Sequence, residues 1–315
     1  MAAVLNSNVA SLWASKNLQG AQSKMADSVE RLSSGLRINR AKDDAAGLGI
    51  ANALTQQING ANQGVRNLND GISMVQTAEG AIAAAQEMGQ RILTLATQGA
   101  NGTLGSSERT ALQSEMRQLI TAIDGIGGRT KFSGNSLLSQ TIAGTATVTL
   151  QVSNNSADTI TLAAGAFRNI GVGYTGTTGT TVGTIASDTT FGGADATKGQ
   201  ASALINAINA TNVTSATGSD AATAMQAVQT AAGNYITALS TQRSLLGAYQ
   251  NQIEFTVSNT TELASNLAAA RSSVQDTDYA SETASLTKGQ ILQQAATAML
   301  AQANQMPNVI LSLLK

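Results

Sequence analysis

The residues best able to perform chemistry lie close together in one charged stretch. Its candidate functional residues could form polar contacts between subunits or within the stretch. They are Arg31, Arg37, Arg40, Lys42, Asp43 and Asp44. Carboxylates beside cations can act as general acid and base on a clamped substrate. However, adjacent residues on a helix point to different faces, and Asp44 stands where a helix N-terminus favours an acid. We therefore interpret the stretch as a joint whose charges form ion pairs, within the chain or between copies, or face solvent.

Other catalytic and ligand-binding patterns are incomplete. Ser285 and Lys288 have the spacing of a Ser/Lys acyl enzyme, but the companion motifs are absent. Asp276 and Asp278 lack the remaining ligands of a calcium loop. The chain has neither cysteine nor histidine, which excludes Ser-His-Asp and Cys-His catalysis, Cys/His zinc sites and disulfides. We predict that the protein is not an enzyme and holds no cofactor or metal.

Composition limits the partners. The net charge is -1 with 12% charged residues, so nothing favours nucleic acid or an anionic membrane. No apolar run is long enough to cross a bilayer, and the N-terminus lacks the pattern of a cleaved secretory signal. We therefore expect any export to use another route. Aromatic residues make up only 3%, which suits long helix–helix seams built from Ala, Leu, Ile and Val.

Apolar residues at helical spacing predict the elements that position the joint. One amphipathic helix runs from Leu5 to about Leu32, and a longer one follows the joint to about Gln98. Glycines inside the longer helix suggest close approach of a neighbouring helix. The segment 101–107 is predicted to be a loop ending in a serine N-cap, and a further helix follows it to Gly127-Gly128.

The heptads return in the C-terminal part of the chain. Residues from Met225 to Val274 share one register, and a last stripe extends to the C-terminal end. The two terminal stripes form a predicted assembly seam made of Leu18, Met25, Leu32, Leu292, Met299, Met306 and Leu313. Because these stripes bury few side chains, the free energy gained by burial barely offsets the backbone entropy lost when the two helices become ordered. We therefore predict that the termini are disordered in the monomer and fold when copies polymerise.

The middle of the chain is different. From 141 to 219 it is rich in Thr, Gly, Ala and Ser, with a β-hairpin signal at 146–152 and 159–162 and a possible helix at 198–210. The expected fold is therefore mainly α: a long antiparallel coiled-coil-like rod with paired terminal helices, a small β-hairpin and a short β- and loop-rich middle segment.

Three motifs resemble those of bacterial flagellin. They are ERLSSGLRINRAKDDAAGLGIA (30–51), NDGISMVQTAEGA (69–81) and ILQQAATAMLAQANQMPNVILSLLK (291–315), and the likeness covers about the first 140 and the last 80 residues. The resemblance implies a structural subunit that polymerises into the flagellar filament for swimming motility. It also implies secretion, unfolded, through the flagellar type III apparatus to the extracellular filament.

The resemblance implies a domain organisation as well. The two halves of a tube-lining inner domain would be 1–44 and 272–315, and the two halves of a rod domain, including the β-hairpin, would be 45–164 and 216–271. A small variable surface-exposed segment would occupy 165–215.

Further partners follow only from the likeness. They are other copies of the chain in a helical homopolymer, an export chaperone that binds the C-terminal helix, junction and cap proteins, and host innate immune receptors. Arg91, Leu95 and Glu115 match the family's innate-receptor epitope. Leu311, Leu313 and Leu314 match leucines read by a cytosolic inflammasome sensor, although assembly is their expected primary role.

Two alternative functions remain open from sequence. A hook–filament junction protein would share the terminal heptads but not the close matches ERLSSGLRIN (30–39) and LAQANQ (300–305). A surface adhesin or polysaccharide-binding homologue would use the Thr/Gly-rich middle block. A protease insertion of the H-E-x-x-H type is excluded because the chain has no histidine.

Overall fold

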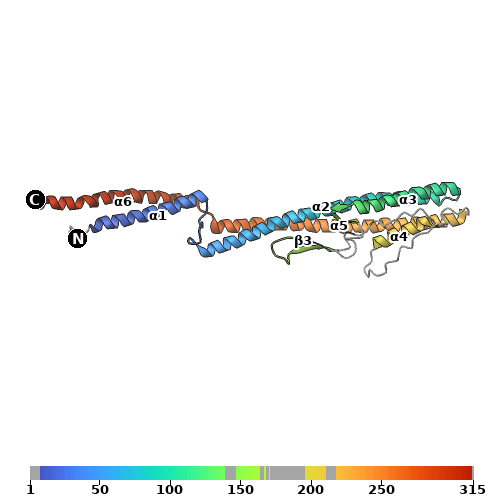
Figure 1. Cartoon of the computed structure of the whole chain (residues 1–315), viewed down its shortest axis with the longest axis horizontal. Coiled ribbons are helices and arrows are strands. Elements are labelled where there is room, and N and C mark those ends of the chain that lie inside the picture. Colours follow the sequence, from blue (N-terminus) through green and yellow to red (C-terminus); the bar gives the residue numbers. More distant parts are fainter. Residues whose placement is uncertain are drawn as a thin grey trace. The chain divides into compact units, whose positions relative to one another are not determined.

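A computed structural model describes residues 8–138, 147–163, 167, 170, 196–210 and 218–313, without the side chains of 196–199, 218 and 306–313. The described chain is mainly helical, as predicted (Figure 1). It divides into two compact units: unit 1 is Met1–Asn59 with Ala264–Lys315, and unit 2 is Gly60–Leu263. Helices α2 (Ala45–Gly99) and α5 (Gly218–Gln275) contribute residues to both units. The first and last segments of the chain therefore belong to one unit.

Unit 1 is built around the two terminal helices. α1 (Val9–Ser34) and α6 (Tyr279–Leu313) lie side by side along their lengths (Figure 1). The Asn8 side chain caps α1 by accepting from the Ser11 amide at 3.1 Å, and its own amide donates to the Ala303 carbonyl at 2.7 Å. One residue thus begins α1 and ties that end of the helix to α6.

Unit 2 contains the main hydrophobic core, shared by α2, α3 (Ser106–Arg129) and α5. The predicted seven-residue seams are confirmed here. The α2 seam residues Leu68, Val75 and Ile82 are fully buried, and so are the α5 residues Leu239 and Leu246. Three- and four-residue steps place these side chains on one face of each helix, which is why two long helices can bury each other.

The loop between α2 and α3 differs from the prediction. Gly105 is the N-cap of α3 and Ser106 is already helical, so the predicted serine cap is wrong. Arg109, with 1% of its surface exposed, ties the two helices instead. Its Nε donates to the Gly99 carbonyl at 3.3 Å and its Nη2 to the Asn101 carbonyl at 3.2 Å. A cation at the C-terminal end of α2 also complements the helix dipole.

Two antiparallel hairpins follow α3. The first joins β1 (Lys131–Phe132) to β2 (Asn135–Ser136) through two left-handed residues, Ser133 at φ 49° and Gly134 at φ 84°. The second joins β3 (Val148–Gln151) to β4 (Thr159–Leu162), with Val148 opposite Leu162 and Gln151 opposite Thr159. The second hairpin confirms the sequence prediction, whereas the first was not predicted.

The glycines of α2 correct the expectation that they serve helix packing alone. Gly60, Gly64 and Gly71 lie against the β3–β4 hairpin, at Asn154, Val152 and Leu150 respectively. Gly89 approaches Ile236 of α5, and Gly99 at the end of α2 approaches Met225 of α5. The small residues therefore mainly provide room for the hairpin, a contact between segments far apart in sequence.

The middle segment is described in part. α4 (Ala196–Asn209) confirms the predicted helix, and its Leu204 and Ile208 are buried in the unit 2 core. Phe167 and Ile170 are buried there too, and the Tyr235 hydroxyl donates to the Ile170 carbonyl at 3.1 Å. The rest of the predicted variable segment lies outside the described residues.

Candidate functional site: the joint and the terminal helices

The joint begins where Gly35 ends α1. Gly35 adopts a left-handed φ of 71°, and its amide donates to the Arg31 carbonyl at 2.9 Å. A Cβ at this position would also lie 3.0 Å from the Tyr279 hydroxyl. Glycine satisfies both demands, so the chain can leave α1 beside the start of α6.

The joint is held by the junction between α5 and α6. The Arg37 amide donates to the Gln275 carbonyl at 2.7 Å, and the Thr277 amide donates to the Gly35 carbonyl at 2.9 Å. Leu36 and Asp276 form the antiparallel bridge between these bonds. The Arg37 guanidinium adds a 2.6 Å bond to the Val274 carbonyl. Both crossings from terminal helix to long helix are thus fixed to each other inside unit 1.

The two candidate carboxylates have separate local roles. Asp43 accepts through Oδ2 from the amides of Arg40 at 3.0 Å and Asn39 at 3.2 Å. The Arg40 amide is the main reason that the pKa of the Asp43 carboxyl lies below its usual range. Asp44 lies at the start of α2, the predicted position for an acid, and caps the helix by accepting through Oδ1 from the Gly47 amide at 2.9 Å. The carboxylates are engaged by the backbone and do not form a catalytic pair.

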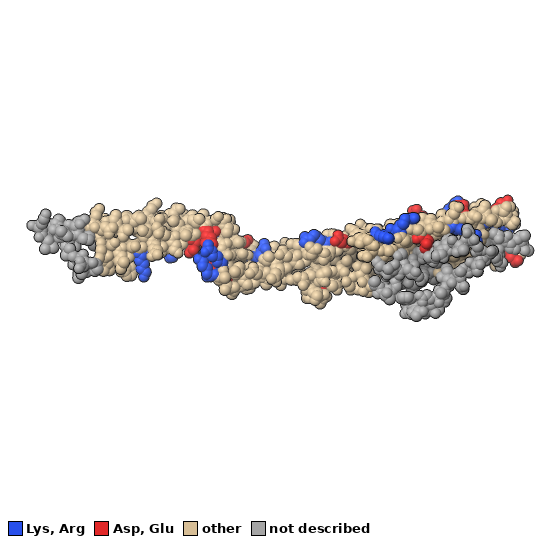
Figure 2. Space-filling view, in the orientation of Figure 1, with Lys and Arg blue, Asp and Glu red and all other residues tan. Residues whose placement is uncertain are grey.

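Two ion pairs lie near the joint, one between the joint and α1 and one between α1 and α6. Arg40 contacts Glu30 at 2.8 Å, and Arg31 contacts Glu282 of α6 at 3.7 Å. Lys42 is exposed and forms no ion pair within the described part of the chain. Figure 2 shows charged side chains gathered at the joint, while the face of the α1–α6 pair seen there is largely uncharged.

The contact between α1 and α6 is made by small residues. The buried positions recur every seven residues: Ala14, Ala21 and Ser28 on α1, and Gly289, Ala296 and Ala303 on α6. The contact within one copy thus uses small residues, and the predicted assembly seam of large residues stays a prediction about contacts between copies. In the sequence Ala296 and Ala303 share the stripe of Leu292 and Met299, whereas the buried small residues of α1 were not predicted.

The predicted large residues lie at the margin of this contact or outside it. Leu18, Met25 and Leu32 are only half-buried, and Leu292 and Met299 are 45% and 65% exposed. The side chains of Met306, Leu311 and Leu313, and all of Leu314, lie outside the described residues. Further large apolar side chains of unit 1 face solvent: Val9, Leu12, Trp13, Val29, Ile50, Tyr279 and Ile291.

The residues matched to an innate-receptor epitope lie in unit 2. The Arg91 guanidinium donates twice to Glu115 Oε1, at 2.7 and 3.0 Å, on the surface between α2 and α3. Leu95 is 1% exposed and belongs to the core. Leu95 therefore packs inside unit 2, and its match to the receptor epitope stays a prediction.

Other chemistry finds no support among the described residues. Ser285 and Lys288 are both exposed on α6. No group of acidic residues is arranged to hold a metal ion in the part of the chain that the structure covers. None of its helices combines the length and apolarity needed to span a bilayer.

Comparison with known proteins agrees with this picture. The family models that match are the bacterial flagellin N-terminal helical region, over residues 5–143, and the bacterial flagellin C-terminal helical region, over residues 228–314. A flagellin of Halalkalibacterium halodurans is 37% identical, with 99% of this chain and 100% of the relative covered. The flagellar filament 33 kDa core protein of Treponema phagedenis is 36% identical, with 99% and 100% covered.

A solved structure shares the fold. The putative flagellar hook-associated protein of Vibrio parahaemolyticus matches with a TM-score of 0.54 and 13% identity, covering 74% of this chain and 100% of that one. At this identity the likeness concerns the fold alone.

Fold and site together define a helical structural protein. The paired helices and the backbone-bonded joint form a scaffold with exposed apolar surface and no catalytic constellation among the described residues. The chain belongs to the bacterial flagellins. It is a structural subunit of the extracellular flagellar filament, which serves motility, and it is not an enzyme; no observation favours the hook–filament junction or adhesin alternatives.

Proposed function

We propose that copies of this chain polymerise chiefly through unit 1, whose terminal helices bind the terminal helices of neighbouring copies. The observation that carries this proposal is the small-residue seam, which holds α1 to α6 and leaves the larger apolar residues exposed. Ile291 and Leu292 on α6 and Leu12 on α1 are each at least 45% exposed. Large apolar side chains exposed on both helices favour an interface, and burial of each stabilises the contact by roughly 1.5–3 kcal/mol.

The proposal predicts which changes stop assembly. The double variant Ile291→Gln, Leu292→Gln should raise the critical concentration for elongation of filament seeds at least about tenfold, because two buried apolar side chains are lost at each contact. The matched control Gln290→Ala, Gln294→Ala changes exposed polar residues on the same helix and should assemble normally. Sedimentation and electron microscopy measure the polymer, and circular dichroism measures helix content. Normal elongation by the first variant would contradict the proposal.

The marginal size of the terminal seam supports a folding transition on assembly. The buried side chains of this seam are Ala, Gly and Ser, which supply little apolar area per residue. The termini of the monomer should therefore be cut first in a limited protease digest and become protected in the filament. A monomer digest that leaves both ends intact would rule this out.

The domain organisation inferred from the likeness is part of the same proposal. Segments 1–44 and 272–315 would line the tube, 45–164 and 216–271 would form the rod, and 165–215 would face outwards. The grouping of both chain ends in unit 1 supports the first pair. Proteolysis of filaments should then remove material from 165–215 before any residue of the terminal segments.

Finer partners are also proposed. Secretion through the flagellar type III apparatus, an export chaperone on the C-terminal helix, and the junction and cap proteins follow from family membership. Recognition by innate receptors would use Arg91 and Glu115 on the surface and Leu311, Leu313 and Leu314 at the C-terminal end. Receptor-reporter assays comparing Arg91→Ala with the Arg117→Ala control, a cation on the adjacent helix, test the surface epitope.

A further inference from the structure

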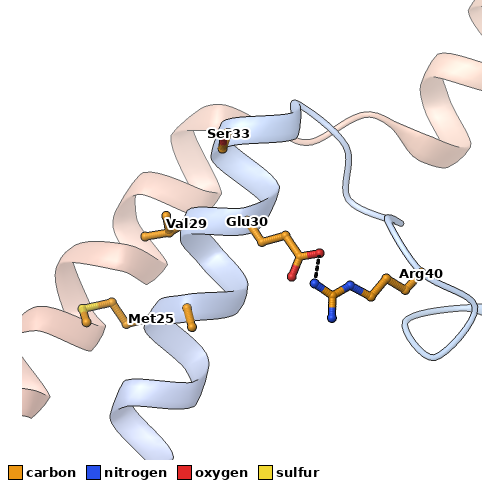
Figure 3. A pocket seen from close by; sticks show the side chains of 6 residues that line it. Met25, Val29, Glu30, Ser33 and Arg40 are labelled. Carbon is orange, nitrogen blue, oxygen red and sulfur yellow. Dashed lines mark ion pairs between the residues drawn. The ribbon is translucent and has the colours of Figure 1, made fainter.

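A groove lies on α1 beside the joint. Met25, Ala26 and Val29 form an apolar floor, and Ser33 with the Glu30–Arg40 ion pair forms the rim. Figure 3 shows Glu30 extending from α1 to meet Arg40, which comes from the joint. The groove has a volume of about 550 Å³, and Val29 is 50% exposed in it. Its apolar floor beside paired charges suits a large side chain that is both apolar and polar.

The other end of α1 carries such a side chain. Trp13 is the only tryptophan of the chain and is 64% exposed, and its neighbour Leu12 is 72% exposed. An indole ring has a large apolar surface and one N–H that requires an acceptor when it is buried. Among the described residues of one copy, most of the Trp13 ring surface is left exposed to solvent.

We propose that Trp13 of one copy inserts into the joint groove of a neighbouring copy. This inference rests on the proposed function and names one contact that holds the polymer together. The Met25 thioether and Val29 pack against the ring, the Arg40 guanidinium lies at its face, and the Glu30 carboxylate accepts the indole N–H. Aromatic rings with both apolar and hydrogen-bond partners are the usual anchors of protein interfaces.

The geometry requires two copies. At ~1.5 Å rise per residue, Trp13 and Val29 are about 24 Å apart along the same helix, so they cannot meet within one chain. Each copy offers the indole at one end of α1 and the groove at the other. A contact between two different surfaces repeats from copy to copy without closing and so extends a filament.

Disulfide trapping tests the contact directly, because the chain contains no cysteine. The double variant Trp13→Cys, Ser33→Cys places its two thiols on one helix about 30 Å apart, beyond disulfide reach within a copy. Oxidised filaments should therefore give a ladder of covalent multimers on denaturing gels. The matched control Trp13→Cys, Gln22→Cys moves the second thiol to an exposed site on α1 away from the groove and should give dimers at most.

Tryptophan fluorescence tests the unmodified chain in case the variants assemble poorly. The emission of Trp13 should shift to shorter wavelength on polymerisation, and the variant Met25→Ala, Val29→Ala should lose most of that shift. Trp13→Ala should raise the critical concentration at least about tenfold, whereas Trp13→Phe should retain much of the assembly.

The outcomes separate the two proposals. A ladder with a shifted emission supports the groove contact. Two results would overturn this inference: filaments that form without the ladder, or an emission shift that the variant Met25→Ala, Val29→Ala leaves unchanged. Either result would mean that Trp13 binds elsewhere, and polymerisation through unit 1 would still stand. If the Ile291→Gln, Leu292→Gln variant assembles normally, the proposed function itself fails.

Discussion

Gly64 on α2 lies directly against the carbonyl of Val152 in the second hairpin. A Cβ at Gly64 would overlap that oxygen, a Cβ at Gly60 would lie 2.8 Å from the Asn154 amide nitrogen, and a Cβ at Gly71 would overlap the Leu150 side chain. The neighbouring Asn67 amide donates to the Gln151 carbonyl at 3.0 Å. The hairpin therefore packs on a helix whose glycines leave space for its main chain at Gly60 and Gly64 and for the Leu150 side chain at Gly71.

We predict that Gly64→Ala destabilises unit 2, because the added Cβ would displace the hairpin from the surface of α2. Overpacking of this kind costs about 1–3 kcal/mol, more than the ~1 kcal/mol that Ala gains over Gly inside a helix. Gly80→Ala is the matched control, since no atom lies within 4 Å of the added Cβ, and it should raise the melting temperature by a few degrees. Thermal unfolding followed by circular dichroism measures the melting temperatures of both variants. Equal shifts in the two variants would contradict the close packing of the hairpin on Gly64.

The burial of the Tyr235 hydroxyl leads us to predict a loss of stability at high pH. Burial raises the pKa of its hydroxyl well above the ordinary value, and the hydroxyl donates to the Ile170 carbonyl. The unfolded chain releases this proton above about pH 10 while the folded chain retains it, so the unfolded state binds fewer protons there. Stability is therefore complete below pH 10 and falls as the pH rises further.

The variant Tyr235→Phe should show a smaller fall in stability above pH 10. It should also lose about 1 kcal/mol at neutral pH through the missing hydrogen bond. Tyr279→Phe is the control, because Tyr279 is 57% exposed. Urea unfolding at neutral pH and above pH 10 provides the free energies, and identical pH profiles for Tyr235→Phe and the unmodified chain would refute the assignment.

The sequence predicts the long helices well, but it does not show which residues of α1 are buried against α6, for one physical reason. The periodic spacing of large apolar residues such as Leu68 and Ile82 is enough to identify the buried face of a long helix. In unit 1 the buried face consists of Ala14, Ala21 and Ser28, residue types that are equally common on surfaces. Their heptad is therefore hidden beneath the more visible stripe of Leu18 and its neighbours.

Contacts between distant segments set the other limit. The contact of the hairpin with Gly64 and the burial of Arg109 depend on chain segments that the fold brings together. No local sequence pattern predicts such contacts. The joint shows both cases. The cap that Asp44 provides for α2 was predictable from local residues, whereas the bonds from Arg37 to the α5–α6 junction were not.

The α2 cap gives a prediction for the joint. Asp44→Ala removes the acceptor for the Gly47 amide, which should cost about 0.5–2 kcal/mol of helix stability. Asp44→Asn retains an acceptor oxygen and should cost less. Hydrogen exchange of the first amides of α2 measures the effect, and equal exchange in both variants and the unmodified chain would remove the capping role.

Asp43 predicts how the joint responds to acid. Main-chain amides lower its pKa, so its contribution to joint stability is present above the ordinary carboxyl pKa of about 4 and is lost as the pH falls through the lowered value. Asp43→Asn should make the exchange of the Asn39 and Arg40 amides insensitive to pH in that range. Asp27→Asn, an exposed acid on α1, is the control and should leave the acid response of those amides intact.

The ion pair between Arg31 and Glu282 predicts how charge serves assembly. Arg31→Glu places two carboxylates together across α1 and α6, where Glu282 is only 14% exposed, and should weaken polymerisation while the helices of unit 2 stay folded. The swap Arg31→Glu, Glu282→Arg restores the pair within a copy. If the swap assembles normally, the charges act inside unit 1; if it assembles as poorly as Arg31→Glu, they act between copies. Seeded elongation measures assembly, and unchanged elongation by Arg31→Glu would exclude both roles for the pair.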